Sequence, residues 1–281
     1  MVKVLLINSQ EVFPVNTASL AGFLLINGFE TEILVDDKVD DYLDEYKPDI
    51  VGINYTSEKD LNIIKTVKNH NILVVVYGMY ATMNTEQLMK EPIDFVIMGE
   101  PEIPMINLLN KIKKNDRNPA DLKAITYRTP DSLFISPDRI LVDALDGLPP
   151  PAYELLPMEK YKRKVSMITS RGCPHKCPNC KIVNMWGDVW RVKNVPFVLS
   201  EIGILLDVYK IKEIHFADEC LTFDVPRIHS LCREIVHRNL QFKWTTGFQF
   251  QKPDLQTLRL MEQAGFKGFV EENTYACKKK T

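Results

Sequence analysis

Three cysteines lie close together in the run Ser170-Arg-Gly-Cys-Pro-His-Lys-Cys-Pro-Asn-Cys180, where Cys173, Cys177 and Cys180 have the spacing C-x3-C-x2-C. Thiolates grouped this closely are typical metal ligands. A cluster of four irons normally takes four cysteines, one for each iron. Three cysteines leave one iron without a protein ligand and open to a small molecule. The spacing therefore predicts a reactive [4Fe-4S] site.

Two other uses of these cysteines remain open. Cys177 and Cys180 form one C-x2-C unit, which His175 or Cys173 could complete as a structural zinc site with four ligands. No second C-x2-C unit exists, and the other cysteines are scattered singly at Cys220, Cys232 and Cys277. A disulfide framework is less favoured, because no signal peptide precedes the first expected strand and cytosolic thiols stay reduced. The pattern favours iron–sulfur over zinc or spare thiols.

The composition is that of an ordinary protein with a full core. The chain has 281 residues, 45% of them hydrophobic and 26% charged, with a formal net charge of -2. This length suggests about two domains. The charge gives no sign of a nucleic-acid or anionic-membrane partner, and no apolar run reaches the roughly 18 residues that a membrane span needs. We therefore expect a cytoplasmic protein that acts on a small-molecule substrate.

The first hundred residues alternate apolar strands with helices. Strands are expected at 2–8, 30–35, 49–55, 72–77 and 94–98, and helices at 18–27, 40–46, 58–69, 84–90 and 102–114. Continuous apolar runs such as 2–8 are typical of strands buried on both faces of a parallel sheet. Five such units predict a doubly wound α/β domain over residues 1–115. No phosphate-binding glycine motif is present, so a nucleotide domain is not indicated.

Ligands of such domains bind outside the carboxyl ends of the strands. The loops at this edge are expected at 8–13, 54–58, 78–82 and 99–102. Gly78 and Gly99 directly follow strands, where a missing side chain lets a ligand approach the backbone. Strand-ending glycines are mostly simple turns, so each one alone is a weak sign of a site.

Residues 116–164 are expected to form a linker with a small hairpin, because short strands at 124–128 and 132–136 flank a Pro-Asp turn. The run Leu148-Pro-Pro-Pro-Ala152 stiffens the chain and marks the domain boundary. Beyond it, strands are expected at 165–169, 212–217, 242–248 and 265–270, with helices at 195–210, 226–239 and 254–264. This alternation predicts a partial (β/α) barrel over 165–270, with its chemistry at the carboxyl ends of the strands.

The cysteine run after the first barrel strand resembles the radical S-adenosylmethionine superfamily. Its members bind a [4Fe-4S] cluster through this spacing, chelate S-adenosylmethionine at the open iron and cleave it reductively to a 5′-deoxyadenosyl radical. The resemblance implies that Cys173, Cys177 and Cys180 are the cluster ligands. Members often carry an aromatic residue before the third cysteine, where this chain has Asn179.

The second expected barrel strand ends at residues 215–219, which read His-Phe-Ala-Asp-Glu. In the superfamily the corresponding strand end, often Gly-Gly-Glu-Pro, holds the methionine amine of the cofactor. The resemblance gives this role to the backbone of Phe216 and Ala217 and to the side chains of Asp218 and Glu219. The alternative is a solvated cap at the start of a helix.

Arg191 ends the run Trp186-Gly-Asp-Val-Trp-Arg191, which also matches the subfamily. A guanidinium group pairs bidentately with a carboxylate, so Arg191 is a candidate partner of the methionine carboxylate of S-adenosylmethionine. An ordinary surface salt bridge is the alternative.

The first domain is similar to the Rossmann-like cobalamin-binding domain that precedes many radical S-adenosylmethionine domains. The similarity rests on residues 49–57, 78–82 and 94–100. It implies cobalamin as a further cofactor, with candidate contacts at Asn8, Thr56, Ser57, Gly78, Gly99 and Glu100.

Two features depart from the pattern of this domain. The fourth strand usually ends in Gly-Gly, whereas here Tyr77 precedes Gly78 and is expected to crowd one face of a bound corrin. The Asp-x-His-x-x-Gly motif that supplies an axial histidine in other cobalamin proteins is missing, and His70 is expected to be exposed at a helix end. A retained scaffold with an empty cleft is the alternative to a cobalamin site.

Relatives in this subfamily include methyltransferases that act on unactivated carbons and the anaerobic oxidative cyclase of magnesium-protoporphyrin monomethyl ester. The resemblance therefore implies a radical enzyme that performs cobalamin-dependent methyl transfer or oxidative cyclisation, with an electron donor such as flavodoxin or ferredoxin. It covers residues 1–270, and the tail at 271–281 is atypical, as in a chain truncated at its C-terminus. The alternatives are a catalytically inactive cluster- or metal-binding remnant and one half of a split enzyme.

Overall fold

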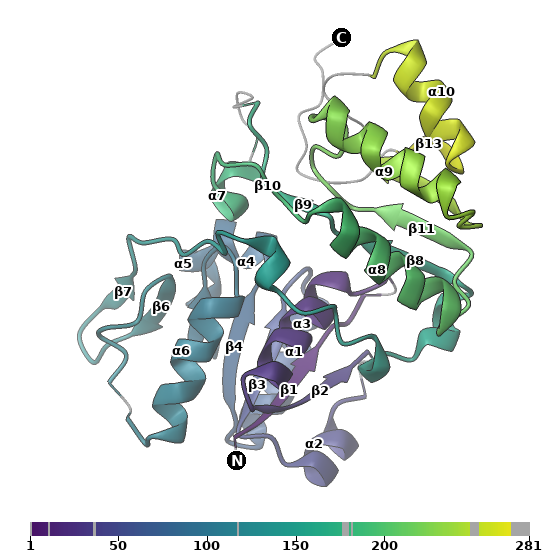
Figure 1. Ribbon diagram of the computed structural model, residues 1–281. Coiled ribbons are helices and arrows are strands. Elements are labelled where there is room, and N and C mark those ends of the chain that lie inside the picture. The colour runs from purple at the N-terminus through teal and green to yellow at the C-terminus, as the bar shows by residue number, and fades with distance from the viewer. Residues whose placement is uncertain are drawn as a thin grey trace. The chain divides into compact units, whose positions relative to one another are not determined.

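The computed structural model describes residues 2–10, 12–35, 38–116, 118–175, 180, 182–247 and 253–270. The chain divides into two compact units (Figure 1). The first unit comprises residues 1–142 and 149–156, and the second comprises residues 143–148 and 157–281.

The first unit contains a seven-stranded sheet in the order β2-β1-β3-β4-β5-β6-β7. Its first five strands are parallel: β1 (Lys3–Ile7), β2 (Glu30–Leu34), β3 (Ile50–Asn54), β4 (Leu73–Tyr77) and β5 (Phe95–Ile97). Because β1 pairs with both β2 and β3, the winding direction changes there, as in doubly wound sheets. The predicted α/β class is confirmed.

Helices cover both faces of this sheet. Helices α1 (Val15–Ile26) and α6 (Glu102–Lys113) share one face in Figure 1. The other helices are α2 (Asp40–Tyr46), α3 (Lys59–Asn69), α4 (Met79–Met83) and α5 (Thr85–Leu88). Leu5 and Ile7 of β1 belong to one buried cluster with apolar side chains of α2 and α3. Burying each large aliphatic side chain contributes roughly 1.5–3 kcal/mol, so the apolar runs account for the sheet.

The opposite face of the sheet depends on a glycine. A Cβ atom at Gly52 would lie 2.7 Å from Leu6 Cδ2, and the next nearest atoms belong to Met105 of α6 and Tyr77 of β4. The missing side chain of Gly52 therefore leaves the space that these three side chains fill beneath α1 and α6.

The expected hairpin forms the outer part of the same sheet. Strands β6 (Ile125–Arg128) and β7 (Leu133–Ile135) are antiparallel, and β6 pairs antiparallel with β5. The proline-rich segment also packs on this unit, since Ala152 N donates to Ala18 O of α1 at 2.9 Å. Both segments belong to the first unit, because their backbone groups are satisfied by its sheet and by α1.

The second unit contains four parallel strands in the order β13-β12-β11-β8. They are β8 (Lys164–Met167), β11 (Glu213–Phe216), β12 (Lys243–Gly247) and β13 (Phe266–Val270). Helices α8 (Val195–Asp207), α9 (Val225–His237) and α10 (Leu255–Gln263) connect them. Aspartates begin two of these helices: Asp224 accepts from Arg227 N, and Asp254 accepts from Thr257 N. The alternation of the predicted partial (β/α) barrel is confirmed.

Short elements complete the described chain. A two-stranded antiparallel sheet pairs β9 (Ser170–Arg171) with β10 (Arg191–Val192), and α7 (Ile182–Trp186) lies between them in sequence. Three 3-10 helices are η1 (Leu145–Gly147), η2 (Tyr153–Leu155) and η3 (Met158–Tyr161). Within the described ranges, every helix is too short or too polar to cross a membrane.

Candidate functional site

The cysteine run begins at the carboxyl end of β8, and a backbone pairing holds its base. Ser170 and Arg171 of β9 pair with Val192 and Arg191 of β10. Gly172 follows with φ of +93°, and a Cβ atom there would lie 2.2 Å from Val189 O. Only glycine combines this φ with such a close backbone approach. The direction in which the loop leaves the sheet is therefore fixed one residue before Cys173.

Two of the three predicted cluster ligands lie in the described part of the chain. Cys173 and Cys180 are half-buried cysteines outside any disulfide, and Cys177 lies outside the described residues. Where side chains are described, no three His, Cys, Asp or Glu residues converge as a metal site. The ligand set thus stays a prediction.

The Cys173 thiol has an immediate sulfur neighbour that the sequence did not single out. Cys220 Sγ donates a hydrogen bond to Cys173 Sγ at 3.2 Å. This bond is the main reason why the pKa of Cys173 is lowered to about 6 despite partial burial. A lowered pKa favours the thiolate, which is the form that binds metals.

Asp218, a predicted contact of the cofactor amine, binds the residues just before segment 173–180, which is called the cysteine loop here. Its Oδ1 atom accepts from Thr169 N at 3.0 Å, from Thr169 Oγ1 at 2.9 Å and from Ser170 Oγ. The side chain is 4% exposed, and burial raises its pKa against the opposing effect of these bonds. Its role as an ammonium ligand stays a prediction, and the structure gives this carboxylate a positioning role.

Arg227 is a second support that sequence reasoning missed. Its Nη2 atom donates to Thr169 O at 3.1 Å and to Lys193 O at 2.9 Å. The arginine is 7% exposed, and burial lowers the pKa of its guanidinium while the negative charge of Asp218 opposes this effect. Arg227 therefore joins the strand end before the loop to the segment after β10. A lone arginine in the first turn of a helix gives no sequence signal for this role.

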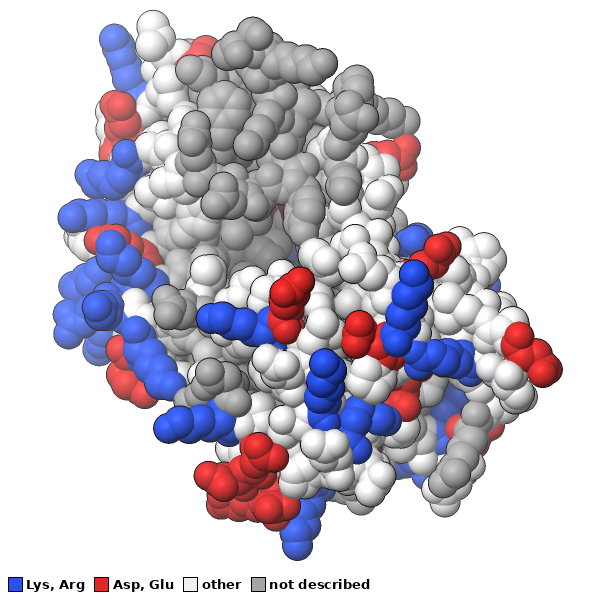
Figure 2. All heavy atoms as spheres, turned by 180° about the vertical axis from the view of Figure 1, so that it is seen from behind, with Lys and Arg blue, Asp and Glu red and all other residues white. Residues whose placement is uncertain are grey.

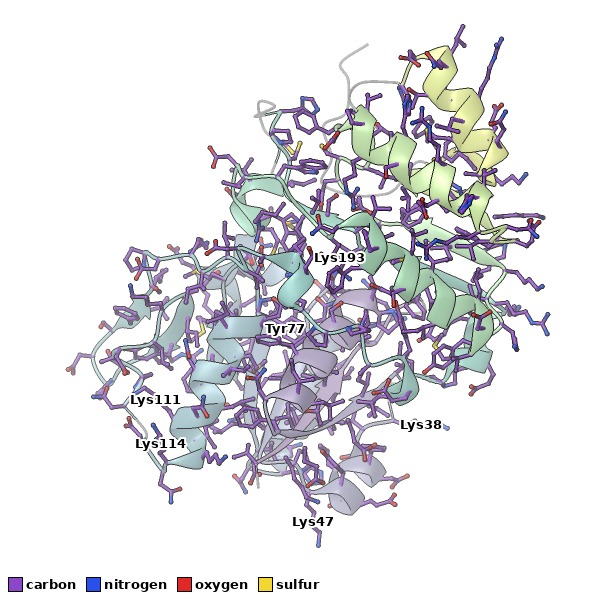
Figure 3. The ribbon with its side chains drawn as sticks, viewed as in Figure 1. Lys38, Lys47, Tyr77, Lys111, Lys114 and Lys193 are labelled. Carbon is purple, nitrogen blue, oxygen red and sulfur yellow. The ribbon has the colours of Figure 1, made fainter. Side chains whose placement is uncertain are left out.

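Lys193 adds an ion pair beside this junction (Figure 3). Its Nζ atom lies 2.7 Å from Oε2 of Glu201, which is 4% exposed on α8. Breaking a buried pair leaves an uncompensated charge, so this ion pair ties the chain after β10 to α8.

Glu219 lies against the helix that follows the cysteine loop. Its Oε1 atom accepts a hydrogen bond from Trp186 Nε1 at 2.5 Å. Desolvation is the main cause that raises the pKa of Glu219 to about 8, and the guanidinium of Arg171 acts in the opposite direction. That guanidinium lies 5.1 Å from the centre of the Trp186 ring. The protonation state of Glu219 is therefore set by two opposing effects, its desolvation and the positive charge of Arg171.

Arg191 reaches the same tryptophan. Its Nη2 atom donates to Trp186 O at 3.2 Å, and the residue is 8% exposed. Arg191 is therefore a buried residue, and its pairing with a carboxylate is not decided by this contact. The role of Arg191 toward a cofactor carboxylate stays a prediction.

The two remaining candidates of this site lie at the end of β11. Phe216 is fully buried, with its ring edge-on to Trp244 at 5.3 Å between centroids. Its carbonyl oxygen accepts from Thr246 Oγ1 at 2.9 Å, and Ala217 N donates to Met167 O at 2.9 Å. These two groups are therefore used by the sheet. Of the run 216–219, the structure brings Asp218 and Glu219 to the cysteine loop.

Basic side chains gather at the opposite edge of the second unit. Exposed Lys and Arg residues lie at or beside the amino ends of β8, β11 and β12: Lys162, Arg163, Lys164, Lys210, Lys212 and Lys243. Figure 2 shows Lys and Arg side chains gathered along the left edge of that view. A strand of four residues spans about 13 Å. These charges are thus separated from the cysteine loop by the length of the sheet.

In the first unit, an unpredicted carboxylate organises the carboxyl edge of the sheet. Asp60 Oδ2 accepts from Thr56 N at 2.7 Å and from Ser57 N at 2.9 Å. Its Oδ1 accepts from Ser9 Oγ at 2.6 Å, and nearby Asn8 is 2% exposed with its amide donating to Gln10 O. The loops after β1 and β3 are thereby joined, and they bring together three of the predicted cobalamin contacts.

The two predicted glycines are linked through one threonine. Thr82 Oγ1 donates to Gly78 O at 2.9 Å and accepts from Gly99 N at 3.0 Å. Gly78 has φ of +102°, and a Cβ atom there would lie 2.3 Å from Asn54 Oδ1. Gly99 has φ of +84°. The neighbouring Glu100 is 1% exposed and accepts from Val142 N. The backbone conformation of both turns therefore requires glycine. The Glu100 carboxylate is buried and accepts its hydrogen bond inside the first unit.

The positions of Tyr77 and His70 bear on two departures from the cobalamin-domain pattern: the tyrosine before Gly78 and the missing axial-histidine motif. Tyr77 is 1% exposed, and its hydroxyl donates to Thr17 Oγ1 of α1 at 3.2 Å, so its ring points into the layer beneath α1 (Figure 3). His70 lies 3.3 Å from Asp40 and 3.4 Å from Asp44, at the amino edge of the sheet. The histidine is therefore remote from Gly78 and Gly99.

Comparison with known proteins gives relatives along nearly the whole chain, although no protein-family model matches it. An uncharacterized methyltransferase of Pyrococcus horikoshii is 30% identical over 90% of this chain and 58% of its own length. Cytidylyl-2-hydroxyethylphosphonate methyltransferase of Streptomyces wedmorensis is 25% identical over 83% of this chain and 51% of its own length. The anaerobic magnesium-protoporphyrin IX monomethyl ester cyclase of Synechocystis is 24% identical over 95% and 58%. The chain thus spans between 51% and 58% of these three relatives.

Two solved structures share the fold. The radical S-adenosylmethionine methyltransferase TsrM from Kitasatospora setae, with cobalamin and a [4Fe-4S] cluster bound, matches 96% of this chain and 58% of its own, with a TM-score of 0.79 and 20% identity. The cobalamin-dependent radical enzyme OxsB matches 94% and 42%, with a TM-score of 0.74 and 18% identity. The fold and the similarity along the chain confirm its resemblance to the radical S-adenosylmethionine superfamily, in the subfamily with an N-terminal cobalamin-binding domain.

Proposed function

We propose that the protein is an iron–sulfur enzyme of the radical S-adenosylmethionine class that cleaves this cofactor reductively. The observation that carries the proposal is the cysteine loop at the carboxyl edge of a parallel sheet, held at its root by Asp218 and Arg227. Loops at this edge carry the chemistry of (β/α) barrels. The names of the sequence relatives, two methyltransferases and a cyclase among them, support an enzyme.

The residues present fit a cluster with three protein ligands. Cys173 and Cys180 are half-buried thiols outside any disulfide, and Cys173 has a lowered pKa. Cys177 would complete the set. When bound to three thiolates, a [4Fe-4S] cluster supplies one open iron for S-adenosylmethionine and the electron for its reductive cleavage. A small electron-transfer protein of the flavodoxin or ferredoxin type would deliver that electron.

Glu219 and Arg191 would orient the amino-acid end of S-adenosylmethionine. Glu219 would accept from the cofactor ammonium while its other contact, to Trp186 Nε1, fixes the direction of the carboxylate. Its pKa of about 8 implies that the ammonium would favour the ionised form on binding. The guanidinium of Arg191, which donates to Trp186 O, would bind the cofactor carboxylate. Asp218 would hold the start of the cysteine loop in place, because its Oδ1 atom already accepts hydrogen bonds from Thr169 and Ser170.

For the first unit, we propose cobalamin binding at the carboxyl edge of the sheet. Gly78 and Gly99 have positive φ angles and no side chains to cover the backbone there, and Thr82 holds the two turns together. Tyr77 does not obstruct this edge, because its ring is buried beneath α1. His70 is at the other edge, so within the described part of this unit no histidine is placed to act as an axial ligand. A bound cobalamin would supply a methyl group for transfer.

Methyl transfer is the reaction that the relatives support best. Two of the three named sequence relatives are methyltransferases, and the fold matches a methyltransferase whose structure contains cobalamin and a cluster. Oxidative cyclisation is the second candidate, supported by similarity to the cyclase.

The test is anaerobic reconstitution of the full chain with iron and sulfide, followed by reduction and electron paramagnetic resonance with and without S-adenosylmethionine. We expect a [4Fe-4S]⁺ signal that changes when the cofactor is added. Cys180→Ala should remove most of the cluster, whereas Cys232→Ala should keep it, because Cys232 is buried on α9 with a pKa raised by burial. A colourless protein with stoichiometric zinc would contradict the proposal.

A further inference from the structure

Three consecutive residues after β11 contact the cysteine loop and the segments directly before and after it. Asp218 accepts hydrogen bonds from Thr169 and Ser170 at its root. Glu219 accepts one from Trp186 in the helix after it. Cys220 reaches the first cysteine of the loop. The side chain of Cys220 is therefore positioned by its two neighbours as well as by its own contact.

The contact of Cys220 with Cys173 is a hydrogen bond between two sulfur atoms. Its Sγ atom lies 3.2 Å from Cys173 Sγ. A disulfide would bring the sulfurs to about 2.05 Å. The observed separation is longer than a disulfide bond, and Cys220 is the donor.

The surroundings of Cys220 make this donor effective. Cys220 is 4% exposed, so bulk water is largely kept from its thiol. Its backbone is held by the neighbouring bonds of Asp218 and Glu219, so a donor in this place needs little reorganisation. A hydrogen bond is stronger in such a low-dielectric site than in water.

We propose that Cys220 is a positioning residue whose thiol donates to the Cys173 sulfur of the cluster site and raises the reduction potential of the bound cluster. The inference rests on the proposed function. Hydrogen bonds to cluster sulfurs are among the features that set the potential. The reduced cluster carries one more negative charge, so a donor at Cys173 stabilises the reduced state more than the oxidised state.

The test compares four forms of the full chain: wild type, Cys220→Ala, Cys220→Ser and Cys232→Ala. Each is reconstituted anaerobically and titrated redox-potentiometrically, with the cluster followed by electron paramagnetic resonance. At the wild-type midpoint we expect Cys220→Ala to lower the ratio of reduced to oxidised cluster by threefold to tenfold. A tenfold change corresponds to about 59 mV for one electron. Cys220→Ser keeps a donor and should shift less, and Cys232→Ala should not shift.

A second measurement reports the hydrogen bond itself. After exchange into deuterated water, electron–nuclear double resonance should detect an exchangeable deuteron near the cluster of the wild type. The same signal should be missing from Cys220→Ala and present in Cys232→Ala. This readout does not depend on turnover, and a merely structural role of Cys220 would not produce it.

The outcomes separate this inference from the proposed function. Clusters with normal iron content and one common midpoint in all four forms would overturn the role of Cys220 and leave the proposed function standing. A Cys173–Cys220 disulfide in the reduced, reconstituted protein would also overturn it. If wild type binds no cluster, the proposed function and the inference fail together. Should Cys220→Ala fail to fold, the midpoint of Cys220→Ser and the deuteron signal of wild type decide.

Discussion

Each unit uses one buried aspartate to organise loops at the carboxyl edge of its sheet, but the two aspartates work in different settings. Asp60 is fully buried and joins the loops after β1 and β3 through neutral donors. Asp218 is also buried and binds neutral donors, yet Arg227 acts on its charge and a cysteine loop follows its partners. The comparison teaches that the same strand-edge device joins two loops in one unit and holds the start of a thiol-bearing loop in the other.

The largest effect should come from removing the carboxylate in the second unit. Asp218→Ala leaves the bonds of Thr169 and Ser170 unmade and removes one of the negative charges that act on buried Arg227. Losing one partner of a buried charged network is expected to destabilise by about 3–5 kcal/mol. The three tryptophans, Trp186, Trp190 and Trp244, all lie in the second unit. Their fluorescence in a denaturant titration therefore reports this loss, and an unchanged midpoint would contradict the role of Asp218.

Asp60→Ala is expected to have a smaller effect, confined to the first unit. It removes an acceptor of two backbone donors and the Ser9 hydroxyl, and unmet donors in buried positions destabilise by about 1–3 kcal/mol. Circular dichroism should show an earlier transition, whereas tryptophan fluorescence should keep its midpoint. If fluorescence shifts equally, the two aspartates do not act on separate units.

Gly172→Ala tests the exit of the cysteine loop. Its φ of +93° and the approach to Val189 O leave no room for a methyl group. Strain of this kind amounts to about 1–3 kcal/mol, and we expect lower iron content after reconstitution. Gly203→Ala is the matched control, because a Cβ atom there meets nothing within 4 Å and alanine stabilises a helix by about 0.5–1 kcal/mol. Equal iron content in both variants would argue against a fixed loop exit.

The smallest effect concerns pH. The pKa of Glu219 is raised from 4.5 to about 8 in the folded protein. The folded state therefore holds a proton that the unfolded state releases, and this contribution to stability is full below about pH 4.5 and is lost as pH rises through about 8. Partial exposure screens the effect, which we expect to be about 1 kcal/mol. Glu219→Gln should flatten the dependence of unfolding free energy on pH between 5 and 8, and an unchanged slope would assign it to other groups.

The elements of the fold could be predicted because they follow local patterns. Apolar runs such as Leu73–Tyr77 predicted buried parallel strands, and glycines such as Gly78 marked where strands end. The hairpin was predicted as part of a linker, but pairing of Ile125 with Ile97 attaches it to the first sheet. The strand partner of an isolated hairpin depends on contacts distant in sequence, which local patterns do not specify.

The candidate site was predictable only in part. The cysteine spacing and residues 216–219 directed attention to one strand edge, and the structure brings Asp218 and Glu219 to that loop. Asp60, Arg227 and Cys220 were missed, because a buried polar residue looks like any surface residue until its partner is known. The sequence did contain a sign that Cys220 lies near the site, since Cys220 directly follows the candidate residues Asp218 and Glu219.

The central claim is that the loop of Cys173, Cys177 and Cys180 holds a four-iron cluster with one open iron. Mössbauer spectroscopy of the full chain reconstituted anaerobically with iron-57 tests it most directly, with and without S-adenosylmethionine. We expect one iron in four to change its spectrum when the cofactor is added, while the other three keep theirs. The claim would be contradicted if none of the four irons changed its Mössbauer spectrum on addition of S-adenosylmethionine, or if the protein took up zinc in place of iron.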